Sequence, residues 1–288
     1  MKKEKKFVRT ILRGVGQVML QNNAYTGLFF LIGIFYSSWT MGIMAILGNL
    51  ASTITAYTFK YKKENIENGV YGFNGVLIGV AIYFYFGLSI VSTIFIIIGA
   101  ILSTLIMYQI KKKMLALTAP FVISTWLIFL VTKLFDIAPL LSLKLQQVNN
   151  LDLFQAMGMS FGQVMFQTSL ITGVIFLIAI LINSRQSALY AIYGAILGSL
   201  VAVIFSLPIP TINLGLWGYN ALLCGIVLES IKWKGFLYAS LAIVLSVVLY
   251  FICEKIGIPA LTAPFVVATW ITLAIKGKKY LFTSSQTL

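Results

Sequence analysis

The chain has 288 residues, of which 60% are hydrophobic and only 10% are charged, and its mean hydropathy is +0.97. So little polar surface excludes a water-soluble domain of this size, and we expect the solvent for most of the chain to be lipid. Histidine is absent, which excludes histidine-based acid–base catalysis, proton relays and imidazole metal ligation.

A membrane-spanning helix needs roughly 20 mostly apolar residues, and six stretches of the sequence approach that length. In chain order they cover residues 40–59, 88–110, 114–131, 186–207, 236–253 and 261–275. Further apolar stretches are interrupted by Gly and Asn and cover residues 20–35, 71–86, 166–181 and 216–228. We therefore expect about ten crossings, with additional short segments at the interruptions.

The N-terminal residues are basic, but Arg9 and Arg13 break the apolar run that follows, so we do not expect a cleaved signal. We expect this segment to be part of the fold. The alternative is that residues 7–20 form an amphipathic helix that lies along the inner membrane surface before the first crossing.

Three motifs of the chain occur twice, in the same order. They begin at Gly16 and Gly162, at Gly69 and Gly215, and at Leu117 and Leu261, so their spacings are 146, 146 and 144 residues. A duplicated half in so apolar a chain indicates a transporter or channel whose substrate path lies between the halves.

The fold class that we expect is an all-α polytopic membrane protein. The first inverted repeat covers residues 1–139, a linker covers residues 140–152, and the second inverted repeat covers residues 153–288. Each repeat would contain about five transmembrane helices and short re-entrant or half helices. An odd number of crossings per half turns the second copy upside down in the membrane, which is the inverted-repeat arrangement.

The net charge of +14 raises the possibility of a nucleic-acid partner, but the basic residues lie in short clusters between the apolar runs. If the N-terminus is cytoplasmic and each half crosses five times, all basic residues except Lys133, Lys144 and Lys255 fall on the cytoplasmic side. We therefore expect an integral protein of the cytoplasmic membrane with both termini inside, and no nucleic-acid partner.

Few side chains are suited to catalysis or ion coupling. All acidic residues lie near predicted loops or ends of spans, whereas an ion-coupled transporter usually carries an ionisable group at mid-membrane depth. Cys224 and Cys253 show no metal or redox spacing, and we expect structural thiols. We expect no cofactor, no metal and no catalytic residue. The remaining polar residues inside the apolar segments are uncharged, as a path for a neutral solute requires.

The repeated motifs also predict where helices break. Pro120 and Pro264 lack an amide hydrogen and disfavour helix at the preceding residue, so we expect each to start a helix. A helix that stops within the membrane leaves carbonyl acceptors for a solute. We expect Asn74 and Asn220 to brace the broken backbone rather than to contact the solute.

These motifs resemble the urea transporter family, from about Arg9 to Lys276. The resemblance rests on Gly-Leu-Trp-Gly-Tyr-Asn, on Thr-x-Pro-Phe and on Gly-Gln-Val-Met-x-Gln followed by Thr-Gly. The family signature Leu-Pro-x-x-Thr-x-Pro-Phe is matched at residues 258–265 except for its first residue, and the copy at residues 114–121 lacks the first proline. The Asn-Pro that precedes Thr-Gly in the family is Asn23-Ala24 in the first half and Ser169-Leu170 in the second.

The resemblance implies a homotrimer, embedded in membrane lipid, in which each protomer has its own pore and passes urea passively as a dehydrated single file. Matched motif by motif, the slot residues would be Phe73, Leu77, Tyr219 and Leu223, with Leu20 and Phe166 as further candidates. Thr118 and Thr262 would supply the central hydroxyls. Gln17 and Gln163 would lie near the pore mouths.

Simpler interpretations remain for these residues. An aromatic residue in an apolar span often only packs, a threonine often bonds its own helix backbone, and a glutamine can join two helices. Other functions also remain open: the same scaffold could pass short amides, ammonia or water, and the chain could be a secondary active transporter or a membrane-embedded enzyme. The missing histidines and the absence of predicted buried carboxylates weigh against the enzyme.

Overall fold

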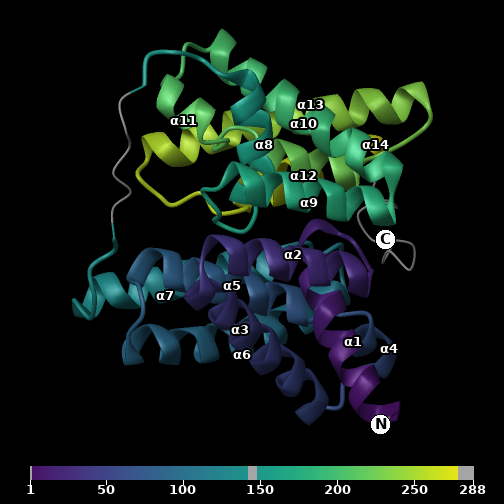
Figure 1. The fold of residues 1–288 in the computed structure, drawn as a ribbon, viewed down its shortest axis with the longest axis vertical. Coiled ribbons are helices and arrows are strands. Elements are labelled where there is room, and N and C mark those ends of the chain that lie inside the picture. Colours follow the sequence, from purple (N-terminus) through teal and green to yellow (C-terminus); the bar gives the residue numbers. More distant parts are fainter. Residues whose placement is uncertain (1, 142–147, 278–288) are drawn as a thin grey trace. The chain divides into compact units, whose positions relative to one another are not determined.

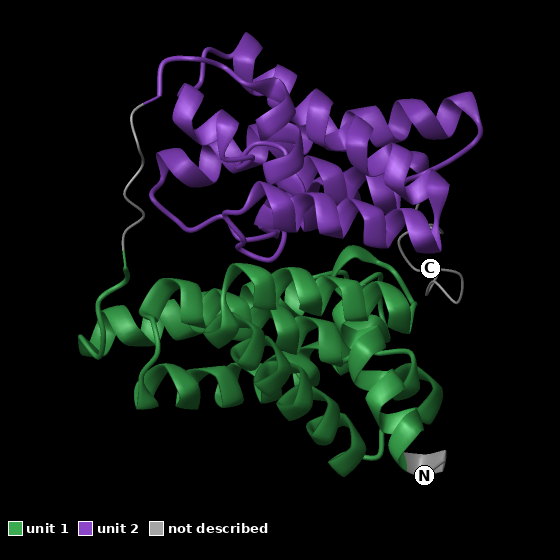
Figure 2. Ribbon diagram, in the orientation of Figure 1, with its two compact units in different colours: residues 1–143 green, residues 144–288 purple. Residues whose placement is uncertain are grey.

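The computed structural model describes residues 2–141 and 148–277, with side chains described from residue 4 onward, and is nearly all helical with no strand in these ranges (Figure 1). The chain divides into two compact units, unit 1 at residues 1–143 and unit 2 at residues 144–288 (Figure 2). This boundary falls inside the predicted linker at residues 140–152, of which residues 142–147 lie outside the described part. Lys144, Lys278 and Lys279 of the charge analysis also lie outside it.

The helices of unit 1 follow one another along the chain, with a short 3-10 turn after the first. They are α1 (Lys2–Gly16), η1 (Gln17–Met19), α2 (Ala24–Ser37), α3 (Trp39–Thr58), α4 (Lys63–Glu67), α5 (Gly72–Phe86), α6 (Ile90–Lys111) and α7 (Ala119–Phe135). Unit 2 contains α8 (Leu153–Gln163), α9 (Leu170–Asn183), α10 (Arg185–Ile204), α11 (Ile209–Asn213), α12 (Tyr219–Val227), α13 (Trp233–Lys255) and α14 (Ala263–Lys276).

The sequence repeat is also a repeat of structure. Helices α2 and α9 both have 14 residues, α3 and α10 both have 20, and α4 and α11 both have 5. Among the described residues, six of the seven residues other than glycine that have a positive φ also occur in equivalent pairs. The pairs are Leu20 and Phe166 (62° and 59°), Lys60 and Ser206 (53° and 54°), and Leu117 and Leu261 (47° and 48°). L-residues rarely adopt this conformation, so these paired backbone angles agree with a duplication of the chain. The opposite orientation of the two copies stays a prediction.

Four helices of the described residues are long and apolar enough to cross a membrane: α3, α6, α10 and α13. Helix α1 with η1 and helix α2 form a fifth candidate, bent by 76° at its break. Helices α5, α7, α9 and α14 are apolar but have only 10–17 residues. The other predicted crossings fall on shorter helices, and their passage through the membrane stays a prediction. The apolar stretches at residues 114–131 and 261–275 lose their first residues because Leu117 and Leu261 turn the chain before each helix begins.

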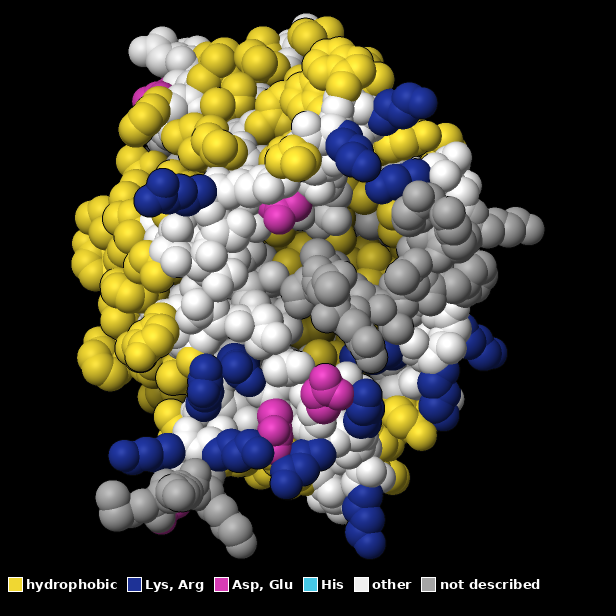
Figure 3. All heavy atoms as spheres, turned by 90° about the vertical axis from the view of Figure 1, so that its right-hand side faces the viewer, with side chains coloured by type: hydrophobic (Ala, Val, Ile, Leu, Met, Phe, Trp, Pro, Cys, Tyr) yellow, Lys and Arg dark blue, Asp and Glu magenta, His cyan; other side chains and the backbone are white. Residues whose placement is uncertain are grey.

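The long helices direct apolar side chains outward and small or polar ones inward. On α6 the exposed side chains include Ile90, Ile94 and Ile98, whereas Ser103 and Thr104 are buried. This distribution is the reverse of that on a soluble helix and suits a lipid surface, where close packing and interhelical hydrogen bonds hold helices together. Figure 3 shows hydrophobic side chains over much of the face that it draws, with Lys and Arg in separate groups.

Glycine and serine bring the backbones of unit 1 together. A Cβ added to Gly48 of α3 would lie 2.0 Å from the carbonyl oxygen of Gly75 on α5, so only glycine fits at this crossing. The hydroxyl of Ser52 donates to the carbonyl of Ala100 on α6 at 3.0 Å. The glycine contact thus lets α5, the helix of Phe73 and Leu77, lie close against α3, and the serine bond ties α3 to α6.

Helix α1 belongs to this packed unit. Asn49 of α3 donates from Nδ2 to the carbonyl of Ile11 at 2.8 Å, and the last three residues of α1, residues 14–16, are buried. The N-terminal half of α1 is mostly exposed and basic. These contacts favour the interpretation of α1 as part of the fold over that of a helix lying on the membrane surface.

Candidate functional site

In each unit, one apolar helix begins only after a residue in the left-handed backbone conformation. Leu117 and Leu261 have φ angles of 47° and 48°, and α7 and α14 start two residues later with a proline in their first turn. Thr118 and Thr262 occupy the N-cap positions of these helices. The prediction that the prolines start helices is confirmed.

A buried asparagine holds the start of each of these helices. Asn74 of α5 accepts a hydrogen bond at Oδ1 from the backbone N–H of Phe121 at 3.1 Å. Asn220 of α12 accepts the equivalent bond from the N–H of Phe265, also at 3.1 Å. The first N–H groups of a helix have no partner within the helix, so a carboxamide from a neighbouring helix replaces the usual cap. The predicted bracing role of both asparagines is confirmed.

The turn in unit 2 has an additional set of bonds. The carbonyl oxygen of Leu261 accepts hydrogen bonds from the Tyr219 hydroxyl at 2.5 Å and from Asn220 Nδ2 at 3.2 Å. Phe73 occupies the position of Tyr219 in unit 1 and has no hydroxyl to donate. The sequence analysis did not predict this bond. The difference between phenylalanine and tyrosine at equivalent positions of the repeats could have indicated it.

The predicted slot residues lie on the two helices that hold these turns. Phe73 and Leu77 are one helical turn apart on α5, and Tyr219 and Leu223 are one turn apart on α12. All four side chains are at most 8% exposed. Each pair therefore lies on the helix whose asparagine contacts the start of α7 or α14. The contact of these side chains with a solute stays a prediction.

Thr118 and Thr262 are 3% and 2% exposed and stand at equivalent places in the two units. Their backbone carbonyls accept the N–H groups of Val122 and Val266, both at 3.1 Å, which closes the first turn of each helix. Both threonines thus stand at the start of a helix, and the role of their hydroxyls toward a solute stays a prediction.

The residues predicted for the pore mouths lie on a second pair of equivalent breaks. Gln17 is in η1 and Gln163 ends α8, and the left-handed residues Leu20 and Phe166 follow each after three positions. Gln17 donates from Nε2 to the backbone carbonyl of Asn68 at 3.1 Å. The amide of Gln17 is thus a link between segments, as the simpler interpretation expected, and its place at a pore mouth is not tested.

The altered family residues before Thr-Gly still cap their helices. Asn23 Oδ1 accepts the N–H groups of Tyr25 at 2.8 Å and Thr26 at 3.3 Å at the start of α2. Ser169 Oγ accepts the N–H of Thr172 at 3.4 Å at the start of α9. Loss of the family's proline at both places therefore leaves the helix start intact.

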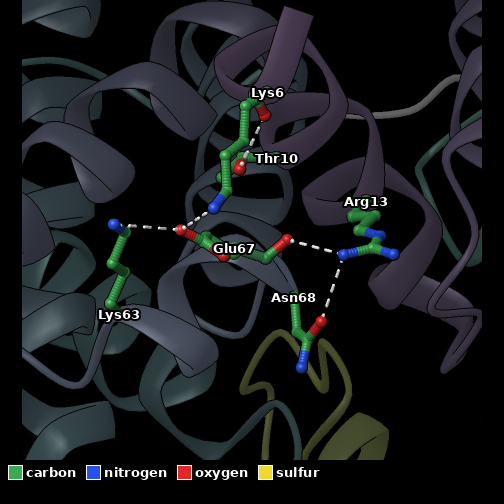
Figure 4. A network of polar contacts seen from close by, with 6 residues as sticks. All are labelled: Lys6, Thr10, Arg13, Lys63, Glu67 and Asn68. Carbon is green, nitrogen blue, oxygen red and sulfur yellow. Dashed lines mark hydrogen bonds and ion pairs between the residues drawn. The ribbon is translucent and has the colours of Figure 1, made fainter. Parts of the chain in front are cut away.

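A charged network at one end of unit 1 joins α1 to α4 (Figure 4). Arg13 Nη1 donates to the backbone carbonyl of Glu67 and to Asn68 Oδ1, both at 3.2 Å. Lys6 Nζ lies 2.8 Å from Glu67 Oε1, and Lys63 Nζ lies 4.0 Å from the same oxygen. Asn68 contacts both Arg13 and Gln17, so this network also fixes the predicted mouth residue.

At the equivalent positions of unit 2, the hydrogen bonds of Asn213 make the contact in place of the ion pairs of Glu67. Asn213, in the place of Glu67, accepts the backbone N–H of Asp152 at 3.0 Å and donates to the carbonyl of Asn150 at 2.8 Å. Asp152 stands in the place of Lys6, and Met159 in the place of Arg13. The sequence analysis missed the network because a contact between α1 and α4 leaves no local pattern.

The described residues contain no group of three or more Cys, Asp and Glu side chains that could hold a metal ion. Cys224 is buried, as expected, and its Sγ lies 3.8 Å from the carbonyl oxygen of Phe265. Cys253 is only half-buried.

Apolar helices with lipid-suited surfaces, and paired broken helices held by buried amides, define an integral membrane protein of the transport class. The chain belongs to the urea transporter family, because the sequence model of that family, described as "Urea transporter", matches residues 8–277.

Mammalian proteins are among its relatives. Urea transporter 1 of Mus musculus is 27% identical over 299 residues, which cover 94% of this chain and 78% of the relative. Urea transporter 1 of Ovis aries is 26% identical over 298 residues, with the same shares. The protein of that name from Rattus norvegicus is 27% identical over 296 residues, which cover 93% of this chain and 77% of the relative.

Proposed function

We propose that this chain passes urea passively across the membrane through a narrow, uncharged pore. The name of its relatives and its family membership supply the solute. The observation that carries the proposal is the pair of equivalent turns before α7 and α14. Each of them presents a threonine at a helix start and is held by an asparagine from a slot helix.

The slot is proposed to consist of Phe73, Leu77, Tyr219 and Leu223. Urea is planar and neutral and carries N–H donors, so a flat passage with aromatic faces and edge acceptors favours it over ions and bulkier solutes. Helices α5 and α12 contain no charged residue. An ion would therefore lose its hydration without compensation, whereas a neutral amide loses only hydrogen bonds that the wall can replace.

The acceptors are proposed to be backbone carbonyls at the broken helices, other than that of Leu261, and the hydroxyls of Thr118 and Thr262. A carbonyl or hydroxyl replaces one water contact at modest net gain, since a typical hydrogen bond is worth only about 0.5–1.5 kcal/mol. Acceptors of this strength allow the solute to leave as readily as it enters. Leu20 and Phe166 are proposed to extend the slot, and Gln17 and Gln163 to border the pore mouths.

We also propose a homotrimer in the cytoplasmic membrane, with one pore per protomer, both termini inside and the second repeat inverted. The distribution of Lys and Arg supports the orientation, and the odd number of crossings predicted for each half supports the inversion. Crosslinking of the purified protein in lipid tests the trimer. Labelling of single cysteines introduced at Ser89 and Lys113, which lie just before and just after α6, tests the orientation.

Transport is proposed to need no ion gradient and no catalysis. A panel of solutes separates this from the alternatives: proteoliposomes are given urea, acetamide, ammonia, glycerol or water gradients, with and without a pH or sodium gradient. We expect urea to permeate fastest relative to empty vesicles, with no accumulation above equilibrium. Faster passage of another solute supports the alternative permeant, and uptake against a gradient supports a secondary active transporter.

A further inference from the structure

The two equivalent turns differ in one hydroxyl group. In unit 2 the Leu261 carbonyl accepts from the Tyr219 hydroxyl at 2.5 Å and from Asn220 Nδ2 at 3.2 Å. A carbonyl oxygen has two lone pairs, so these donors occupy its acceptor capacity. In unit 1 the equivalent Phe73 has no hydroxyl, and Asn74 Nδ2 has no hydrogen-bond partner among the described residues.

The ring of Tyr219 is also held from its other side. It packs edge-on against Tyr250 of α13, with ring centroids 5.9 Å apart and the planes at 90°. Tyr250 in turn packs edge-on against Trp217, whose centroid lies 4.8 Å away. Edge-to-face contacts at such distances are favourable. Tyr219 therefore links α13 to the turn before α14 and is fixed at both its ring and its hydroxyl.

We propose that Tyr219 is a positioning residue: its hydroxyl, together with Asn220, fixes the Leu261–Thr262 turn and thereby makes unit 2 the size-selective part of the path. This inference rests on the proposed passage of urea. The bound carbonyl cannot swing toward the solute, and the ring cannot rotate to admit a wider one without losing the bond. The turn at Thr118 lacks this hydroxyl bond and has more freedom to adjust.

The direct test is Tyr219→Phe, which removes one oxygen and keeps the ring. The matched control is Tyr190→Phe, because the Tyr190 hydroxyl also donates to a backbone carbonyl in unit 2, that of Ser230, at 2.6 Å. Stopped-flow light scattering of proteoliposomes gives the permeabilities to methylurea and to urea. We expect Tyr219→Phe to raise the methylurea-to-urea ratio by roughly two- to tenfold, the range that one net hydrogen bond allows. Tyr190→Phe should keep the wild-type ratio.

A second measurement does not depend on urea. Hydrogen exchange of the full chain in detergent is followed in the segment at residues 261–266. We expect faster exchange there in Tyr219→Phe and wild-type exchange in Tyr190→Phe. If the wild-type protein passes no urea, the proposed function fails, and faster exchange in Tyr219→Phe still shows that Tyr219 holds the turn. A wild-type methylurea-to-urea ratio in Tyr219→Phe, with urea flux intact, overturns the proposal whether or not exchange changes.

Discussion

The carboxamide oxygen of Asn220 accepts the backbone N–H of Phe265 at 3.1 Å and so ties the slot helix α12 to the start of α14. The same bond at the same distance joins Asn74 to Phe121 in unit 1. Two copies that share only part of their sequence have kept this contact. It holds the first turn of a helix that contains a proline, which has no amide hydrogen. The residue in left-handed conformation before this turn prevents the helix from starting earlier.

Replacing Asn220 with leucine keeps the side-chain volume and removes both of its hydrogen bonds. The Phe265 N–H then stays buried without its acceptor, which typically costs about 1–3 kcal/mol. We expect a lower unfolding temperature of the detergent-solubilised protein, measured by intrinsic fluorescence. The control is Asn149→Leu, since Asn149 is exposed. Equal unfolding temperatures of the two variants would contradict the bracing role.

Thr262→Val keeps the shape of the side chain and removes its hydroxyl. We expect urea flux in proteoliposomes to fall by roughly two- to tenfold, because one weak acceptor is lost from the path. Trimer yield should fall less than the flux, as measured by crosslinking in lipid. Thr58→Val is the control, since the exposed Thr58 hydroxyl donates to its own helix at Ile54. Wild-type flux with normal assembly in Thr262→Val would refute the role of this hydroxyl.

Phe73→Ala should widen the slot and reduce the preference for urea over acetamide. Truncation of a buried phenylalanine also costs about 3–5 kcal/mol of stability, so the variant needs a control with a similar loss. Phe30→Ala supplies it, because Phe30 is fully buried in α2 and belongs to no predicted slot. We expect both variants to unfold at lower temperature and only Phe73→Ala to change the permeability ratio. A changed permeability ratio in both variants would attribute the effect to the loss of stability and would contradict a specific role of Phe73 in the slot.

The turn between α12 and α13 makes stability depend on pH. Burial raises the pKa of the Glu229 carboxyl above its usual value, and a hydrogen bond from Ser187 only partly offsets this. The pKa of a glutamate in the unfolded chain is near 4.3. A higher pKa in the folded protein stabilises the fold at low pH, and this stabilisation is lost as the pH rises through the pKa of the folded protein. We expect Glu229→Gln to unfold at a higher temperature than the wild type at pH 7, with a smaller difference at pH 4.

The contrasting variant for this prediction is Glu64→Gln. A hydrogen bond and the charge of Lys62 lower the pKa of the exposed Glu64 carboxyl, so its contribution is present at neutral pH and is lost as pH falls. We expect Glu64→Gln to give a difference of the opposite sign, and a small one because the group is exposed. A Glu229→Gln variant less stable than the wild type at pH 7 would contradict the cost assigned to its burial.

Much of the fold could be predicted because the chain repeats itself and because proline has simple backbone chemistry. Pro120 and Pro264 start their helices as expected, and Asn74 and Asn220 brace them. Composition alone could not show that Leu117 and Leu261 cut the apolar stretches short, because a left-handed residue leaves no trace in hydropathy.

The contacts that escaped prediction all join residues distant in the sequence. Tyr219 and Leu261 are brought together only when α12 packs beside the start of α14. Comparison with Phe73 suggested that Tyr219 acts through its ring and not as a hydrogen-bond donor. Arg13 and Glu67 meet through the packing of α1 against α4. Such pairs follow from tertiary structure, whereas helix starts follow from local chemistry.

The passage of urea through an uncharged pore is tested most directly by light scattering of proteoliposomes under a urea gradient. Three preparations are compared: empty vesicles, vesicles with the wild-type protein, and vesicles with the Thr118→Val, Thr262→Val double variant. We expect the wild-type protein to raise urea permeability well above that of empty vesicles, without an ion gradient, and the double variant to lose most of that increase. Wild-type vesicles no more permeable to urea than empty ones, with the protein folded and inserted, would contradict the proposed function.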